Sequence, residues 1–277
     1  MSKGSQPTDD GNFIFNTKEE LGAFLDKEPN AKKFIRKYVG SREFINSLDR
    51  WCLWMIDAEP NELRNLPSIL EKIERVKLFR SKSTSTATRS YMYHHLFQQI
   101  HQPKGNYLVI PSVSSERRNY IPFGFYDTSI ITSNLCLIIP EASLFHFGIL
   151  SSSIHMAWIK YVCGRLKSDY RYSKDIVYNN FPWPENPTDK QKEAIETAAQ
   201  AVLDARLQFP TSSLADLYDP NSMPPALVKA HQQLDKAVDL CYRPQPFINE
   251  TKRIEFLFEL YDKYTAGLFV KEKKKKK

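Results

Sequence analysis

The sequence predicts an α+β protein in which a central mixed α/β domain lies between an N-terminal helical segment and a C-terminal helical bundle. The prediction rests on helical spacing of apolar residues in the first part, short β-rich runs after Asn106, and renewed helical spacing after Pro187. At 277 residues, the chain has the length of about two ordinary domains. The expected parts are, in chain order, 1–80, 81–186, 187–266 and a disordered Lys-rich tail at 267–277.

The first eighty residues are expected to be helical. Thr17 and Glu20 form a capping box at the start of a first helix. Gly40 is expected to precede a second helix, which carries the apolar residues between Phe44 and Met55. The apolar residues from 66 to 79 recur at steps of three and four and predict a third helix.

The central part begins with Ser81–Ser90, a run rich in small hydroxyl side chains. This run is either a hinge or a loop whose hydroxyls and cations lie along phosphates, and the sequence leaves both interpretations open. A helix is expected at about Ser151 to Val162. Strands are expected at 107–110, 120–125, 130–132 and 135–139.

Three helices with short connections are expected after Pro187, which implies a small bundle. Thr188 and Gln191 form the capping box of the first. The pair Pro224-Pro225 begins the second, and Asn249 precedes the third.

Composition narrows the class of protein. The net charge is +7, and the folded part with the clearest excess is residues 81–180, with 10 basic against 5 acidic side chains. A phosphate backbone would be attracted there. The apolar runs are too short to span a membrane and no signal peptide begins the sequence, so we expect a cytoplasmic protein without membrane contact. The four scattered cysteines are expected to be small buried hydrophobes, not zinc ligands or disulfides.

The stretch from Gly164 to Pro184 holds four cations, two carboxylates, three tyrosines and two asparagines. Lys167, Asp169 and Arg171 occupy every second position of it, a spacing that points all three to one side of an extended segment. A donor, an acceptor and a second donor match the edges of bases in a major groove. These three residues are the candidate base readers.

A second polar stretch, from Ser114 to Tyr120, lies between two expected strands. Its hydroxyls and arginines could contact phosphates or guanine, with Glu116 holding one arginine in place, although a surface charge pair on a hairpin is the alternative. The remaining candidate DNA-binding residues are Ser114, Ser115, Glu116, Arg117, Arg118, Tyr120, Arg165, Tyr172, Lys82 and Lys104.

Motifs of catalysis are missing from the sequence. There is no phosphate-binding loop, glycine-rich cofactor loop, zinc-protease motif or nucleophile elbow. Asn180-Phe181-Pro182-Trp183 is similar to the turn with which amino-methyltransferases hold a flipped adenine, but Phe181 replaces the first proline. A structural role for this tetrapeptide is therefore expected, and no catalytic, cofactor-binding or metal-binding residue is predicted.

Several of these stretches resemble one family. V-S-S-E-R-R-N-Y-I-P-F-G-F (113–125), C-G-R-L-K-S-D-Y-R-Y-S (163–173) and V-Y-N-N-F-P-W-P (177–184) are similar to the target-recognition region of MmeI-like restriction-modification enzymes. The stretch 213–227 resembles their C-terminal helical domain. These enzymes join an endonuclease, an S-adenosylmethionine-dependent adenine methyltransferase and a DNA-reading domain in one chain.

The resemblance implies a sequence-specific reader of double-stranded DNA that works with a methyltransferase domain, either as a fragment or as a separate specificity subunit. It implies no cofactor in this chain, because S-adenosylmethionine would bind the absent catalytic domain. It also implies that Lys167 and Asp169 form a base-reading pair, with Arg171 reading a neighbouring base. A non-catalytic RNA-binding or protein-interaction scaffold is the alternative.

Overall fold

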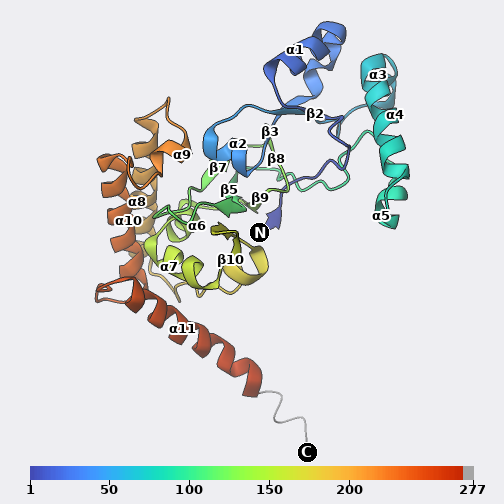
Figure 1. Cartoon of the computed structure of the whole chain (residues 1–277). Coiled ribbons are helices and arrows are strands. Elements are labelled where there is room, and N and C mark those ends of the chain that lie inside the picture. Colours follow the sequence, from blue (N-terminus) through green and yellow to red (C-terminus); the bar gives the residue numbers. More distant parts are fainter. Residues whose placement is uncertain (271–277) are drawn as a thin grey trace, which may run out of the picture. The chain divides into compact units, whose positions relative to one another are not determined.

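The computed structural model describes residues 1–270, which form two compact units (Figure 1). The first unit consists of Met1–Val109 and Phe125–Pro140. The second consists of Ile110–Gly124 and the residues from Glu141 onward. The chain therefore crosses between the units three times. Residues 271–277, which make up most of the predicted Lys-rich tail, lie outside the described residues.

Two four-stranded sheets form the centre of the first unit. Their strands are β1 (Ser2–Lys3), β2 (Ile14–Phe15), β3 (Ile35–Val39), β4 (Trp51–Leu53), β5 (Tyr107–Pro111), β7 (Gly124–Tyr126), β8 (Ile130–Thr132) and β9 (Cys136–Pro140). One sheet has the order β2-β4-β3-β8, with β3 antiparallel to β4 and parallel to β8. The other has the order β1-β9-β5-β7. The connection between β5 and β7 belongs to the second unit.

Short helices accompany these sheets, and apolar side chains of the sheet β2-β4-β3-β8 are buried with them in one core. They are α1 (Lys18–Lys27), the 3-10 helix η1 (Pro29–Phe34), α2 (Ser41–Asn46), α3 (Pro60–Arg64), α4 (Pro67–Ser81) and α5 (Thr86–Arg89). The core includes the fully buried Phe13, Leu53 and Ile69. Arg80 is also fully buried, and its guanidinium donates to the backbone oxygens of Thr8 and Pro7 at 2.9 and 2.7 Å.

The expectation of an entirely helical segment over 1–80 is wrong. The capping box at Thr17 does begin α1, since Glu20 N donates to Thr17 Oγ1 at 3.1 Å. The second expected helix, however, ends at Asn46, and the apolar residues that follow form β4. An apolar run at the centre of a sheet is buried on both faces, so its spacing cannot be told from that of a buried helix.

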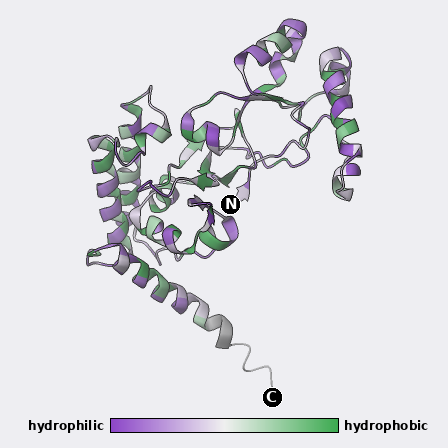
Figure 2. Cartoon of the chain, in the orientation of Figure 1, coloured by the Kyte–Doolittle hydropathy of each residue, from purple (hydrophilic) through white to green (hydrophobic). Residues whose placement is uncertain are grey.

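The second unit is mostly helical and carries one small sheet. Its elements are α6 (Leu144–Leu150), α7 (Ser153–Val162), the π-helix η2 (Lys174–Tyr178), α8 (Asp189–Leu207), α9 (Leu214–Leu217), α10 (Pro225–Tyr242), α11 (Glu250–Val270) and the strands β6 (Val113–Ser114), β10 (Gly164–Leu166) and β11 (Asp169–Arg171). Helices α8 and α10 lie side by side, with hydrophobic and hydrophilic residues interleaved along both (Figure 2). Gly148 lets α6 pack closely on α8, because a Cβ there would lie 2.6 Å from Ile195.

The predicted starts of the three C-terminal helices are confirmed. Gln191 N donates to Thr188 Oγ1 at 3.3 Å at the start of α8, and Lys252 N donates to Asn249 Oδ1 at 3.0 Å at the start of α11. Pro225 is the first residue of α10. These caps satisfy backbone donors that have no partner within the helix.

In the central part, the predictions at 107–110 and 130–132 agree with β5 and β8, and 135–139 agrees with β9 to within one residue. The prediction at 120–125 is wrong for most of its length, because the strand there begins only at Gly124. The helix expected at 151–162 is α7, which is preceded by the unpredicted α6. Strands and helices nevertheless mix as expected, and the α+β class is confirmed. Among the described helices, none has both the length and the apolarity to cross a lipid bilayer.

Candidate nucleic-acid interface

A hairpin formed by β10 and β11 carries the three candidate base readers. Leu166 pairs with Asp169, so Lys167 and Ser168 form a two-residue turn. Lys167 is exposed and has φ 56°, the positive value that such a tight turn requires. The expectation that Lys167 lies within an extended segment is therefore wrong, because the chain reverses there. Lys167 lies at the tip of the hairpin.

The hairpin has one buried face and one open face. Tyr170 and Tyr172 are each 3% exposed, and side chains alternate along a strand, so Asp169 and Arg171 lie on the other face. These two residues share a side, as their spacing predicts. The antiparallel register places Leu166 opposite Asp169 on this open face. The face therefore combines an acceptor, a cation and an aliphatic side chain.

One oxygen of the Asp169 carboxylate accepts a hydrogen bond within the protein. Glu116 donates its backbone N–H to Asp169 Oδ1 at 3.4 Å. The positive charge of Arg118 also acts on Asp169, and partial burial lowers the pKa of the Arg118 guanidinium. No donor among the described residues reaches Asp169 Oδ2. That oxygen is free to accept a hydrogen bond from an incoming group.

Arg165 fastens the hairpin to the loop after β6. Its guanidinium lies 4.2 Å from the centre of the Tyr170 ring and donates to Ser168 O at 2.9 Å. It also forms an ion pair with Glu116 at 3.5 Å. Glu116 was expected to hold one of the arginines of its own stretch, whereas this ion pair joins it to Arg165 of β10. Together these contacts occupy most of the hydrogen-bond donors of the Arg165 guanidinium within the protein.

The loop after β6 is a tight turn in which one arginine is internal and one is external. Arg118 donates to the buried Ser114 Oγ at 3.3 Å, whereas Arg117 is exposed. Ser115 accepts from the backbone N–H of Arg117 at 3.3 Å and shapes the turn. Of these side chains, Arg117 is the one fully available to a phosphate, and Ser114 is not, because it is 2% exposed.

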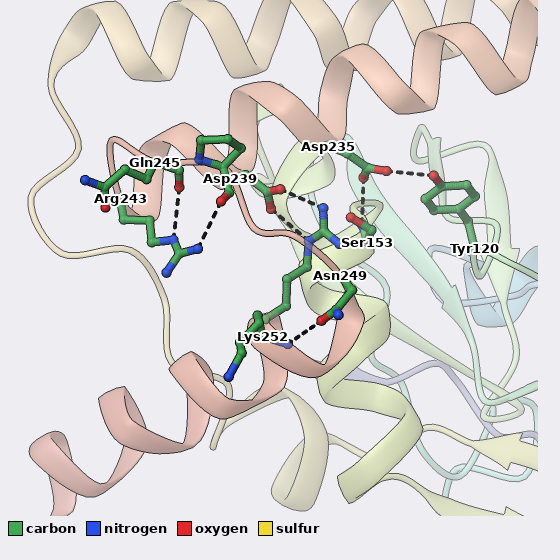
Figure 3. A network of polar contacts seen from close by, with 10 residues as sticks. Tyr120, Ser153, Asp235, Asp239, Arg243, Gln245, Asn249 and Lys252 are labelled. Atoms are coloured by element: carbon green, nitrogen blue, oxygen red, sulfur yellow. Dashed lines mark hydrogen bonds and ion pairs between the residues drawn. The ribbon is translucent and has the colours of Figure 1, made fainter.

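Tyr120 anchors the end of this loop to helix α10 (Figure 3). Its hydroxyl donates to Asp235 Oδ2 at 2.7 Å, and its ring stacks on His231 at a centroid distance of 4.0 Å. Asp235 Oδ1 accepts from Ser153 N at 2.7 Å, at the first residue of α7. One carboxylate thus holds both the loop that follows β6 and the helix that precedes β10. Burial raises the pKa of Asp235.

Tyr172 is anchored in the same way. Its hydroxyl lies 2.9 Å from His155 Nε2, and both side chains are buried. Burial lowers the pKa of His155 to about 3, so this imidazole is neutral. Tyr172 cannot contact DNA, and its inclusion among the candidate DNA-binding residues is corrected: it belongs to the core beneath the hairpin.

The tetrapeptide that begins at Asn180 has its side chains engaged within the protein. The Asn180 amide donates to the backbone oxygens of Asp175 and Ile176 at 2.7 and 3.1 Å. Phe181 is buried, with its ring 4.5 Å from His155. The aromatic residue of the motif is Trp183, whose ring packs against those of Phe181 and Tyr178 at centroid distances of 5.6 and 5.8 Å. The Asn180 amide is already engaged, so the tetrapeptide is not arranged to hold a flipped base.

The candidate DNA-binding residues are divided between the two units. Lys82 and Lys104 are exposed but belong to the first unit, whereas the others belong to the second. The four cysteines are free and buried, as expected. No group of three or more His, Cys, Asp or Glu side chains suited to a metal ion occurs within residues 1–270.

Sequence patterns did not reveal Leu166, His155, His231 or Asp235 as parts of this region. His155 contacts Tyr172, which is 17 residues away in the chain, and Asp235 bonds Tyr120, which is 115 residues away. His231 stacks on the same Tyr120, so no local spacing marks any of the three. The sequence signal that could have identified Leu166 is its position immediately before Lys167, the first of the three candidate base readers.

Comparison with known proteins gives a consistent result. Residues 1–185 match the family model of the MmeI target recognition domain, and residues 187–269 match that of the MmeI C-terminal domain. DNA methyltransferase A of Bacillus subtilis (strain 168) is 40% identical over 263 residues, which are 95% of this chain and 30% of that protein.

A solved structure is also similar: Type IIL restriction-modification enzyme MmeI in complex with DNA. It has 49% sequence identity and a TM-score of 0.92, and the match covers 96% of this chain and 35% of that one. The chain thus spans about a third of the length of each of these relatives. The two family models together account for nearly all of its residues, and the chain belongs to the MmeI family as a target recognition domain followed by the C-terminal domain.

Proposed function

We propose that this chain is the sequence-reading module of a restriction-modification DNA adenine methyltransferase. The observation that carries the proposal is the hairpin, which presents Lys167 at its tip and Asp169 and Arg171 on its open face. Arg165 and the two tyrosines hold the hairpin from the opposite face. A base-reading side chain must be held in position, because a mobile side chain could shift to form hydrogen bonds with the wrong base as well.

The proposed contacts follow from the chemistry of each side chain. Lys167, at the tip, donates to O6 and N7 of a guanine. The free Oδ2 of Asp169 accepts from N4 of a cytosine, so the pair suits one orientation of a G·C base pair. Arg171 contacts a neighbouring base. A hairpin of two strands has the width that the major groove of B-DNA admits.

Positioning contacts would come from other cations. Arg117, exposed on the loop beside Asp169, is placed to contact a phosphate, and Ser115 and Glu116 support that loop. We propose phosphate contacts for Lys82 and Lys104 on the first unit as well. Such contacts fix the register of the protein on the duplex without reading sequence.

Methyl transfer would be performed by a methyltransferase domain or subunit that is the partner of this module. That domain would bind S-adenosylmethionine and act on an adenine flipped out of the stack. The DNA substrate would place this activity in the cytoplasm. The boundary between the two parts of the module is proposed near residue 186, just before the cap of α8, and the other predicted boundaries stay predictions.

The proposal predicts a strong preference for duplex DNA over duplex RNA of the same sequence. A-form RNA has a major groove too deep and narrow for side chains to read, although its phosphates attract the same cations. A binding sequence is first selected from randomised duplexes with the whole chain. The selected DNA is then expected to compete on the order of 10³-fold better than either its RNA counterpart or a scrambled DNA duplex.

Two variants calibrate this measurement. Arg171→Ala, on the open face, should lower the preference for the selected duplex, whereas Lys190→Ala, an exposed cation on α8, should leave it unchanged. Equal competition by RNA and by both DNA duplexes would instead support an RNA-binding or protein-interaction scaffold.

A further inference from the structure

Leu166 is an exposed aliphatic side chain beside the proposed base readers. It is 51% exposed and immediately precedes the turn residue Lys167. Its pairing partner across the hairpin is Asp169, so the two side chains leave the sheet on the same face. Water therefore contacts an apolar group at the position where the protein would meet the edges of bases.

The other residues of β10 cannot replace Leu166 in this position. Gly164 has no side chain, and the Arg165 side chain lies on the opposite face, against the Tyr170 ring. The face thus presents one aliphatic group from β10, next to one acceptor. A side chain that is half exposed contributes little to the core, so packing does not require a leucine at this position. Contact with a ligand is then a reason for an aliphatic residue here.

The separation of side chains across the hairpin is of the same order as the spacing of stacked base pairs. Side chains directly opposite each other in an antiparallel pair have Cβ atoms about 4.5–5.5 Å apart. Successive base pairs are about 3.4 Å apart along the helix axis. When Asp169 contacts one base pair, Leu166 therefore lies over the same pair or the next one.

Only one natural base offers an apolar group in the major groove. Thymine carries its C5-methyl group there, whereas a G·C pair presents acceptors and a donor. If Asp169 reads the cytosine of a G·C pair, a methyl contact with Leu166 has to come from the neighbouring pair.

We propose that Leu166 is a specificity-determining residue that contacts the C5-methyl group of a thymine adjacent to the base pair read by Lys167 and Asp169. This inference rests on the proposed function. It adds an apolar contact to a reading surface whose other members are charged. The recognised sequence then contains a thymine at that neighbouring position.

Deoxyuridine provides a test with a change of one methyl group. Each thymine of the selected duplex is replaced in turn by deoxyuridine, and binding of the whole chain is measured. One replacement is expected to weaken binding about fourfold, as for the loss of one buried methyl-sized group. Leu166→Ala should bind the thymine and deoxyuridine duplexes equally. Leu207→Ala, a control at a 76% exposed leucine on α8, should retain the fourfold difference.

Two results would overturn the inference: no deoxyuridine replacement weakens binding, or Leu166→Ala remains as sensitive to the replacement as the parent chain. A thermal melt of each variant checks that the fold is intact, and Leu166→Met should keep the sensitivity. Failure of the proposed function is distinct, since the parent chain would then bind the selected and scrambled duplexes equally.

Discussion

Exchange of the two hairpin charges, Lys167→Glu together with Asp169→Arg, is expected to reverse the preferred base pair at one position from G·C to C·G. Arg at position 169 donates to guanine where Asp169 accepted from cytosine, and Glu at position 167 accepts where Lys167 donated. Each such contact discriminates by about 1–3 kcal/mol, so the preference should change by at least about tenfold. Selection from randomised duplexes by the parent and exchanged chains measures the change.

The exchange has a matched control on α8. Lys190→Glu with Glu193→Arg exchanges one cation and one carboxylate at exposed positions, and it should leave the selected sequence unchanged. The hairpin exchange also removes the acceptor of the Glu116 N–H, so some loss of affinity is expected without loss of the new preference. If the parent and exchanged chains select the same base pair, Lys167 and Asp169 are not its readers.

Acidification from pH 6.5 to pH 5 is expected to destabilise the second unit by about 3 kcal/mol. Burial lowers the pKa of both His155 and His231 from 6.5 to about 3. Because these pKa values are depressed in the folded state, the stabilisation is complete above pH 6.5 and is lost as the pH falls toward 3. The slope from each histidine approaches about 1.4 kcal/mol per pH unit as the pH falls below 6.5. A loss of this size is a large fraction of a typical free energy of unfolding.

Asp235 acts in the opposite direction. Burial raises its pKa, so its protonation in the folded state adds stability as the pH falls toward the ordinary value. This offsets part of the loss from one histidine. The two histidines remain dominant because both are almost fully buried and both titrate over the same range.

Urea unfolding of the whole chain at several pH values measures this effect. His155→Gln and His231→Gln keep a polar side chain but do not titrate, so each should remove about half of the pH dependence between 6.5 and 5. A pH dependence that is the same in both variants as in the parent chain would contradict the assignment to these histidines. Loss of DNA binding should accompany the unfolding, since the two imidazoles contact Tyr172 and Tyr120 beneath the hairpin.

The parts of the fold that sequence predicts well are those with local signals. The capping residues Thr188 and Asn249 mark helix starts because the bonds they make lie within one turn. Trp51–Leu53 was predicted as helix and forms β4, because its pairing with β2 and β3 depends on residues far away in the chain. Local spacing carries no information about such pairing.

The candidate site follows the same division. Alternation predicts that Asp169 and Arg171 share a face, since this depends only on strand geometry. The turn at Lys167 was missed because its two residues include neither Gly nor Asn, the usual signals of a tight hairpin. Tyr120 and Tyr172 looked like surface groups in a polar stretch, whereas their partners Asp235 and His155 hold them inside.

The central claim is that Lys167 and Asp169 read a base pair in the major groove, and the most direct test removes one acceptor atom from the DNA. Each guanine of the selected duplex is replaced in turn by 7-deazaguanine, which lacks N7 but keeps O6 and base pairing. One replacement is expected to weaken binding of the parent chain about tenfold, the value of a hydrogen bond to a charged group, and to leave binding of Lys167→Ala unchanged. Unchanged binding of the parent chain at every guanine, or equal weakening in Lys167→Ala, would contradict the claim.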